Sequence, residues 1–440
     1  MMQLNKKHCN IALFFFIITL FLIPEIKILS SMPKFRLEDL LFPFIALYVI
    51  KNYKLIVDAR NYEEIKKYIG LWLCFVIVII LSILFNLYHT STSDLFEIYK
   101  PIKAIVLFSF FLILNTQKIN TYFPLAIATF GLLIFNLFQY FDIWDFNIYV
   151  EVHYAPPHHL IYFGYNTLFE PVTKRLLGTL GNPNNNAILF ACLSIYFLAI
   201  KTENKKIKIV NYILFTCCSI ACIQSQSRTT FIGLALALVF YVIVDRKNLI
   251  VSFMPFIISL FIVVVYFLNA DLRYLHTLKQ LKITTSKNTI AIAKNEVDKR
   301  KKAFQSADGD FKFESNNESL KGRFEIWREL FAMAIKKPVL GYGPYKGYFY
   351  SNTIYSENEF LLNFWRYGLV GLVNYTLLVL FPFMLYFKNR NSRGTLILTC
   401  VFIIINISSL TNNPISSPFL LFLIMLLMGC NFSAEANEKK

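Results

Sequence analysis

Long apolar runs recur along the whole chain, and they constrain its fold more than any other feature. Runs of about 20 apolar residues, the length that crosses the hydrocarbon core of a bilayer, follow one another with short polar breaks between them. Of the 440 residues, 56% are hydrophobic and only 16% are charged, a composition that soluble domains do not have. The sequence therefore predicts an all-α, polytopic integral membrane protein.

The hydropathy predicts twelve transmembrane helices. They lie at residues 10–24, 37–50, 68–88, 99–115, 121–141, 185–200, 207–223, 229–244, 249–268, 360–387, 395–410 and 416–431. Lysines and arginines gather in alternate connecting segments, and such positive residues mark the cytoplasmic side. We therefore expect both termini to be cytoplasmic, and the first helix to be uncleaved because no small-residue cleavage site follows it.

Two long segments face outwards in this topology, at 142–184 and 269–358. The second is far longer than a connection needs to be, which predicts a functional element. We expect three parts: helices one to nine in 1–268, the large outer loop in 269–358, and the last three helices with a short tail in 359–440.

Arg228 lies in a polar break, 224–230, between two apolar runs. The break is too short to carry the guanidinium far from the membrane, where an arginine usually has a partner. One interpretation is an arginine whose charged end reaches the membrane surface. A site for an anion, lined by serine, glutamine and threonine, fits the surrounding residues better.

An amphipathic helix is predicted near the end of the large loop, from Gly322 to just before Pro338. Its apolar side would carry Phe324, Trp327, Phe331, Ala334 and Ile335, and its polar side Glu325, Arg328, Glu329 and Lys336. A helix lying on the bilayer would explain the basic residues of the polar side. Arg323, beside the unpaired N–H groups of the helix start, suits a phosphate instead. A tight turn that includes Tyr342 follows.

Two carboxylates precede the tenth predicted span. Ser356 and Glu359 have the S-x-x-E spacing of a capping box, which predicts that Glu359 caps the helix. Glu357 has no such structural role and is the candidate for chemistry. Asn363 and Arg366 follow Glu359 on the same helical face. They are predicted to line a site, because ionisable residues entering a span normally face the interior of the bundle.

Arg175 ends the first outer loop and is a further candidate for binding an anion, while Asn184 is a predicted N-cap of the sixth span. Three other patterns are typical of metal sites but are weak in this context. They are the histidines His153, His158 and His159, the Asp308-Gly309-Asp310 triplet, and the acidic pair Glu38-Asp39. We expect no metal at any of them.

Taken in order, these short motifs resemble the O-antigen polymerase and O-antigen ligase superfamily. The ordered set comprises Arg175, Gly178, Asn182-Pro183-Asn184, Ser225-Gln226-Ser227-Arg228, Arg323, Trp327, Pro338, Gly341-Tyr342-Gly343, Glu357-Asn358, Leu361, Gly368-Leu369 and Gly371. The long outer loop near three-quarters of the chain agrees with this resemblance.

The resemblance implies a glycosyltransferase of the bacterial inner membrane that needs neither metal nor cofactor. Its donor would be a glycan on undecaprenyl pyrophosphate, used at the periplasmic face. Arg228 and Arg323 would hold the pyrophosphate, and Glu357 would deprotonate the acceptor hydroxyl. The residues expected to bind substrate are Arg175, Asn358, Asn363, Arg366 and Tyr342. The implied partners are the lipid-linked glycan, the lipid bilayer, a flippase and a chain-length regulator, and no nucleic acid.

Three functions fit this resemblance to different degrees. In ligases the position before the span looks like histidine followed by asparagine, whereas this chain has Glu357 followed by Asn358. That difference favours a polymerase over a ligase. A non-enzymatic transporter or flippase of the same lipid-linked glycan would have inverted repeats or interrupted helices, and neither is visible in the sequence.

Overall fold

The computed structural model describes residues 6–24, 36–59, 61–150, 153–155, 175–245, 253–269, 319–346, 356–390 and 392–432. In these ranges the regular structure is helical, and no strand is present. The long helices are α1 (Lys6–Leu22), α2 (Leu37–Lys51), α4 (Tyr62–Phe85), α5 (Thr92–Thr116), α6 (Tyr122–Phe141), α8 (Pro183–Ala199), α9 (Lys205–Gln224), α10 (Arg228–Val244), α12 (Phe253–Asn269), α15 (Ser319–Lys336), α17 (Glu359–Lys388), α18 (Arg393–Ser409) and α19 (Pro418–Phe432). Short helices connect them at α3 (Lys54–Val57), η1 (Leu87–His89), α7 (Phe146–Tyr149) and η4 (Gly178–Leu180).

Each of the twelve segments predicted from hydropathy contains a helix, so the all-α class is confirmed. Four helices of the described ranges, α4, α6, α9 and α17, are both long and apolar enough to cross a membrane. Shorter apolar helices occupy Leu13–Leu22, Arg228–Val244, Ile257–Tyr266, Arg393–Ser409 and Pro418–Phe432. The protein thus has the helices of a membrane protein, while the number of its spans stays a prediction.

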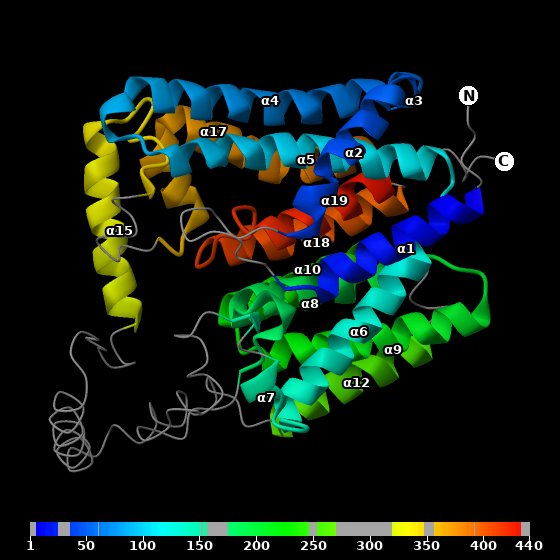
Figure 1. Ribbon diagram of the computed structural model, residues 1–440. Helices are drawn as coiled ribbons and strands as arrows, with labels where there is room; N and C mark the ends of the chain where they lie inside the picture. The colour runs from blue at the N-terminus through cyan, green and yellow to red at the C-terminus, as the bar shows by residue number, and fades with distance from the viewer. Residues whose placement is uncertain are drawn as a thin grey trace, which may run out of the picture.

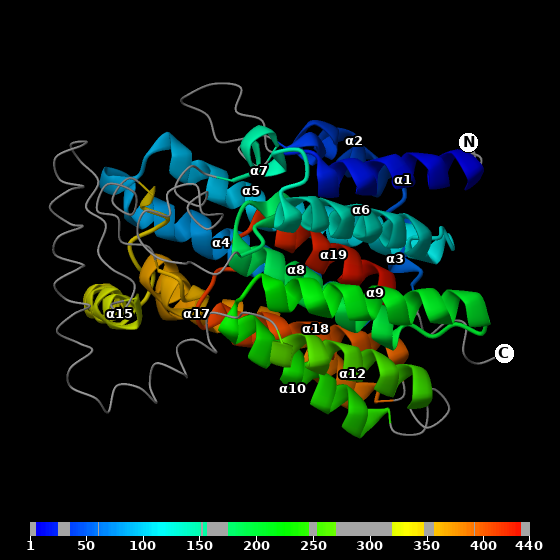
Figure 2. The same cartoon turned by 90° about the horizontal axis from the view of Figure 1, so that it is seen from below.

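The long helices run roughly parallel in one bundle, and α15 crosses one end of it (Figure 1). At its centre lie α8, α18 and α19, whose side chains are buried on nearly all sides, as expected of helices that are apolar all round. Around them, α4, α6, α10 and α12 expose large apolar side chains outwards. The view from below shows the same arrangement, with α15 seen end-on beside the bundle (Figure 2).

The first and last described helices meet at the end of the bundle opposite α15. The start of α1 and the end of α19 both lie there (Figure 1). An even number of membrane crossings would produce this arrangement, while the side of the membrane on which the termini lie stays a prediction. The other end, where α4 ends and α5 and α17 begin, carries α15 and is called the mouth below.

The helix predicted from Gly322 is present as α15, which begins at Ser319. It packs on α17 through Ile326, Leu330, Met333 and Ala334. Phe324, Phe331 and Ile335, from the side predicted to be apolar, are 62%, 51% and 56% exposed. α17 therefore covers only one edge of the apolar side of α15.

α17 is interrupted at Gly368, which the sequence analysis did not anticipate. This glycine has φ +65° and ψ −164°, a conformation that is essentially restricted to glycine. The turn after α15 fills the break with main-chain hydrogen bonds: the N–H of Gly343 donates to the Arg366 carbonyl at 2.8 Å, and that of Leu369 to the Pro338 carbonyl at 2.7 Å. About 20 residues follow the break, roughly 30 Å of helix, which is enough to cross a bilayer alone.

Candidate functional site

An ion pair between Arg323 and Glu357 joins α15 to the residues before α17 at the mouth. Each side chain is 30% exposed. The pair connects two segments whose motifs the sequence analysis had selected separately, one as an anion-binding arginine and the other as a candidate base. The fold therefore brings these two candidates into direct contact.

Glu357 has an unusual electrostatic environment for a carboxylate at a helix start. Burial raises the pKa of the Glu357 carboxyl above its ordinary value, and the charges of Arg323 and Arg175 only partly oppose this. Arg175 therefore belongs to the same neighbourhood, although it comes from the other outer segment. A carboxylate with a raised pKa, held beside two guanidinium groups, can take a proton from a hydroxyl and lies where an anion would be attracted.

Arg175 itself holds the turn that precedes Arg228. Its Nε donates to the Ser225 carbonyl at 3.1 Å, and its Nη2 donates to the Asn184 side chain at 3.0 Å and to the Gln226 carbonyl at 3.4 Å. The side chain is buried. Arg175 thus fixes the backbone that leads into α10, and Arg228, the first residue of α10, is exposed at that point.

The predicted N-cap of the sixth span was wrong by two residues. Asn182, not Asn184, is the N-cap of α8, since its side chain accepts the N–H groups of residues 184 and 185 and Pro183 takes the first helical position. The side chain of Asn184 is therefore available to Arg175, and it accepts the hydrogen bond described above.

The predicted capping box at the start of α17 was also wrong. Asn358 is the N-cap, and its side chain accepts the Leu361 N–H at 3.0 Å. Glu359 is buried and reaches across to the loop between α18 and α19. There it accepts the N–H groups of Ile415 at 3.0 Å and Ser416 at 2.6 Å. The assignment of a structural role to Glu359 and a chemical role to Glu357 stays a prediction. Glu359 does have main-chain partners in a distant loop that Glu357 lacks.

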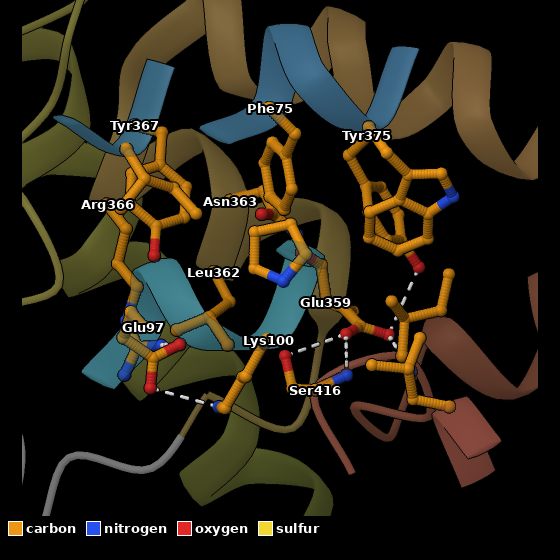
Figure 3. Close-up of a pocket in the computed structure, with 15 residues that line it drawn as sticks. Phe75, Glu97, Lys100, Glu359, Leu362, Asn363, Arg366, Tyr367, Tyr375 and Ser416 are labelled. Carbon is orange, nitrogen blue, oxygen red and sulfur yellow. Dashed lines mark hydrogen bonds and ion pairs between the residues drawn. The ribbon is translucent and has the colours of Figure 1, made fainter. Parts of the chain in front are cut away.

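A small cavity, lined by both apolar and charged side chains, lies beside this start of α17 (Figure 3). Glu359, Asn363 and Arg366 line it from α17, as their shared helical face predicted, and Glu97 and Lys100 line it from α5. Its volume is about 30 Å³, room for about two water molecules. A sugar would not fit inside, so the cavity can hold only small groups.

Glu97 is a charged residue that the sequence analysis missed, and it collects three cations. Its carboxylate lies 2.9 Å from Lys100 Nζ, 2.9 Å from Lys346 Nζ and 3.9 Å from Arg366 Nη1. A signal for it exists in the sequence, since ionisable residues near the end of an apolar run are seldom without a role. Arg366 thus belongs to this second group, and Asn363 lines the same cavity.

Tyr342 has a packing role in the described structure. Its ring stacks on Trp365 with centroids 6.2 Å apart, and Lys337 Nζ lies 4.7 Å from the centre of the same ring. The main-chain N–H of Tyr342 donates to the Trp365 carbonyl at 3.1 Å. Tyr342 therefore fixes the turn onto α17, and its predicted contact with substrate stays a prediction.

The patterns typical of metal sites have separate outcomes. His158, His159 and the Asp308–Asp310 triplet lie outside the described residues. Asp39 of the acidic pair accepts Lys103 Nζ at 2.7 Å and the Tyr99 hydroxyl at 2.9 Å, so it holds α2 against α5. Within the described ranges, no three His, Cys, Asp or Glu side chains gather closely enough to hold a metal ion.

Comparison with known proteins supports the resemblance seen in the motifs. Residues 213–376 match the family described as O-Antigen ligase. This range contains Arg228, Arg323 and Glu357, and the cavity-lining residues Asn363 and Arg366. The chain matches no curated protein. The domain at residues 213–376 thus supports the resemblance of this chain to the superfamily of O-antigen ligases and polymerases that its motifs indicated.

Proposed function

We propose that this protein is an O-antigen polymerase. It would join oligosaccharide repeat units carried on undecaprenyl pyrophosphate, at the periplasmic face of the bacterial inner membrane. The observation that carries the proposal is the Arg323–Glu357 ion pair at the mouth. Its carboxylate, Glu357, occupies the position that looks like histidine in ligases.

The reaction would proceed by one displacement. The Glu357 carboxylate takes the proton from a hydroxyl of the acceptor sugar, and that oxygen attacks the anomeric carbon of the donor glycan. The bond between this carbon and the pyrophosphate oxygen breaks as the new glycosidic bond forms. Arg228 and Arg323 neutralise the charge that develops on the departing undecaprenyl pyrophosphate, a role that a divalent metal has in other transferases.

The ion pair has a consequence for this mechanism. While Arg323 is paired with Glu357, the guanidinium is oriented but partly neutralised. A pyrophosphate that carries more negative charge than one carboxylate would draw Arg323 towards itself. Glu357 would then lose its nearest cation and become a stronger base when the donor is bound.

Arg175 acts in this proposal as a positioning residue. It binds the two carbonyls of residues 225 and 226, so it sets where α10 begins and where Arg228 emerges. Asn358, as the N-cap, likewise sets the direction of Glu357 from the start of α17.

The proposal includes a topology. Twelve spans with both termini in the cytoplasm would put the mouth, α15 and the Arg323–Glu357 pair on the periplasmic side, where the lipid-linked donor is presented. The bilayer, a flippase that delivers repeat units and a chain-length regulator would be its partners.

A ligase that transfers finished glycan to lipid A-core or to a protein is the second candidate. The description of the matched family, O-Antigen ligase, favours it. A transporter is less well supported, even though α17 is interrupted. About 20 residues of helix follow Gly368, enough for a full span, so the break lies near the mouth, whereas transporter sites lie near mid-membrane.

The experiment that tests the proposal is a lipopolysaccharide gel of a strain that lacks this gene, beside the complemented strain. Core carrying a single repeat unit, with the ladder lost, is the result expected of a polymerase. Bare core with accumulated lipid-linked polymer would identify a ligase. An unchanged ladder in the deletion strain would contradict both functions for this glycan.

A further inference from the structure

The cluster around Glu97 has more basic groups within reach of solvent than acidic ones. The side chains of Lys100 and Lys346 are 30% and 17% exposed, whereas those of Glu97 and Arg366 are 6% and 8% exposed. An anion that approaches the cavity would therefore meet two ammonium groups before it met the carboxylate. The buried Arg366 lines the cavity together with Lys100 and Glu97 (Figure 3).

Two other carboxylates, those of Asp94 and Glu359, lie near this cluster. Asp94 accepts the N–H of Ser91 at 2.8 Å and the main-chain N–H of Lys346 at 2.9 Å. Glu359, which also lines the cavity, accepts the hydroxyl of Ser416 at 2.8 Å (Figure 3). Glu97 forms ion pairs with all three cations, and Asp94 adds a second negative charge beside Lys346, so these two carboxylates face three positive charges.

The cluster and the Arg323–Glu357 pair are separate groups at the mouth. Glu97 and Lys100 come from α5 and Lys346 from the turn after α15, whereas Arg323 comes from α15 itself. The mouth thus presents two groups of cations, one paired with Glu97 and the other with Glu357. A reaction between two lipid-linked pyrophosphates needs two such groups.

We propose that Lys100, Lys346 and Arg366 form a second anion site, which binds a phosphate group of the acceptor lipid. The identity of the acceptor rests on the polymerase function, but the anion site itself does not. The phosphate sits at the opening of the cavity, because the cavity is too small to enclose it, and displaces water from the ends of the two lysines. The donor pyrophosphate remains with Arg228 and Arg323.

The test is calorimetric titration of inorganic pyrophosphate into the purified full-length protein in phosphatidylcholine nanodiscs. Lys100→Gln and Lys346→Gln should each weaken one binding event by about tenfold or more, the loss expected for one charge-assisted hydrogen bond. Lys336→Gln, which changes an exposed lysine of α15, is the matched control and should leave binding unchanged. Glu97→Gln should tighten binding, a result that a purely structural salt bridge would not produce.

Separate variants distinguish this inference from the proposed function. The Arg228→Ala, Arg323→Ala double variant should lose one binding event and keep the one that depends on Lys100 and Lys346. If the double variant keeps both binding events, Arg228 and Arg323 do not bind the donor pyrophosphate, whereas the second anion site is still supported. If neither binding event is weakened by Lys100→Gln or Lys346→Gln, the second anion site is overturned. This holds whether or not thermal unfolding shows that these variants are destabilised.

The source of the phosphate is tested by the lipid. In nanodiscs that contain phosphatidylglycerol, the lysine-dependent binding of pyrophosphate should persist at an unchanged affinity. Loss of this binding event would mean that the site takes the headgroup of bulk anionic lipid, which overturns the assignment to the acceptor.

Discussion

Replacing Glu359 by glutamine should lower the stability of the protein, whereas the same change at Glu357 should stop turnover. The two carboxylates are two residues apart and both belong to the start of α17. They differ in their partners, so the same substitution separates a structural role from a chemical one.

The cost at Glu359 follows from its four donors. Oε1 accepts the N–H of Ser416 at 2.6 Å and its hydroxyl at 2.8 Å. Oε2 accepts the N–H of Ile415 at 3.0 Å and the hydroxyl of Tyr375 at 3.1 Å. Glutamine has one acceptor oxygen, and its NH₂ group must face one of these two pairs. A hydroxyl can rotate to accept, but a main-chain N–H cannot, so one buried N–H loses its partner at a cost of about 1–3 kcal/mol.

The cost at Glu357 should be small, since it pairs with Arg323 at a site where both side chains are 30% exposed. Such pairs contribute about 0–1 kcal/mol. Its loss as a general base should instead lower turnover by about 10²–10⁴-fold.

The assay uses the purified protein in nanodiscs, with thermal unfolding for stability and polymer formation from lipid-linked repeat units for turnover. Glu359→Gln should lower the midpoint of unfolding and retain turnover below it, while Glu357→Gln should do the reverse. Turnover at the wild-type rate in Glu357→Gln would refute the assignment of the base. Loss of turnover in Glu359→Gln without loss of stability would show that the two roles are interchanged.

Four further predictions follow from the site and its supports. Arg228→Ala and Arg323→Ala should each lower turnover by about 100-fold or more in protein that is still inserted in the membrane. Arg328→Ala, at an exposed position of α15, should not lower it. Equal effects of all three substitutions would contradict the binding of the donor pyrophosphate by Arg228 and Arg323. Turnover should fall as the pH drops through the raised pKa of Glu357, because a protonated carboxyl cannot accept a proton. Glu357→His should move the midpoint of this fall in the pH profile up to about pH 6.5. An unchanged midpoint would exclude Glu357 as the group that titrates. EDTA should leave polymer formation intact, and activity that returns only with added Mg²⁺ or Mn²⁺ would contradict the metal-independent mechanism. Gly368→Ala should destabilise the protein by about 1–3 kcal/mol, whereas Gly70→Ala, whose added methyl would meet nothing within 4 Å, should not; equal unfolding midpoints would show that the break in α17 is not under this constraint.

Much of the fold could be predicted from hydropathy, because a long apolar run has few alternatives to a helix in a membrane. Which side of a helix is buried against the rest of the protein is harder to predict from the sequence than the helix itself. α15 has apolar residues around most of its circumference, and only the position of α17 decides that Leu330 is covered and Phe331 is not. The spacing of residues 324–335 is consistent with either side.

Predictions from local sequence patterns in the site were wrong where a side chain binds a partner that is far away in the chain. Ser356 and Glu359 have the right spacing for a capping box, but the partners of Glu359 are 56 and 57 residues away. Asn358, another residue type preferred at the N-cap, takes that position, and its side chain accepts the N–H of Leu361. The cluster at Glu97 depends on Lys346, about which the local sequence of α5 contains no information.

The break in α17 has a mechanical consequence for the mouth. The turn after α15 is joined to it by main-chain hydrogen bonds, among them those from the N–H groups of Gly343 and Leu369, and by the stacking of the Tyr342 ring on Trp365. A displacement of α15 is therefore transmitted to α17 at the break. The alignment of Arg323 with Glu357 thus depends on the geometry of this turn and on the missing Cβ at Gly368.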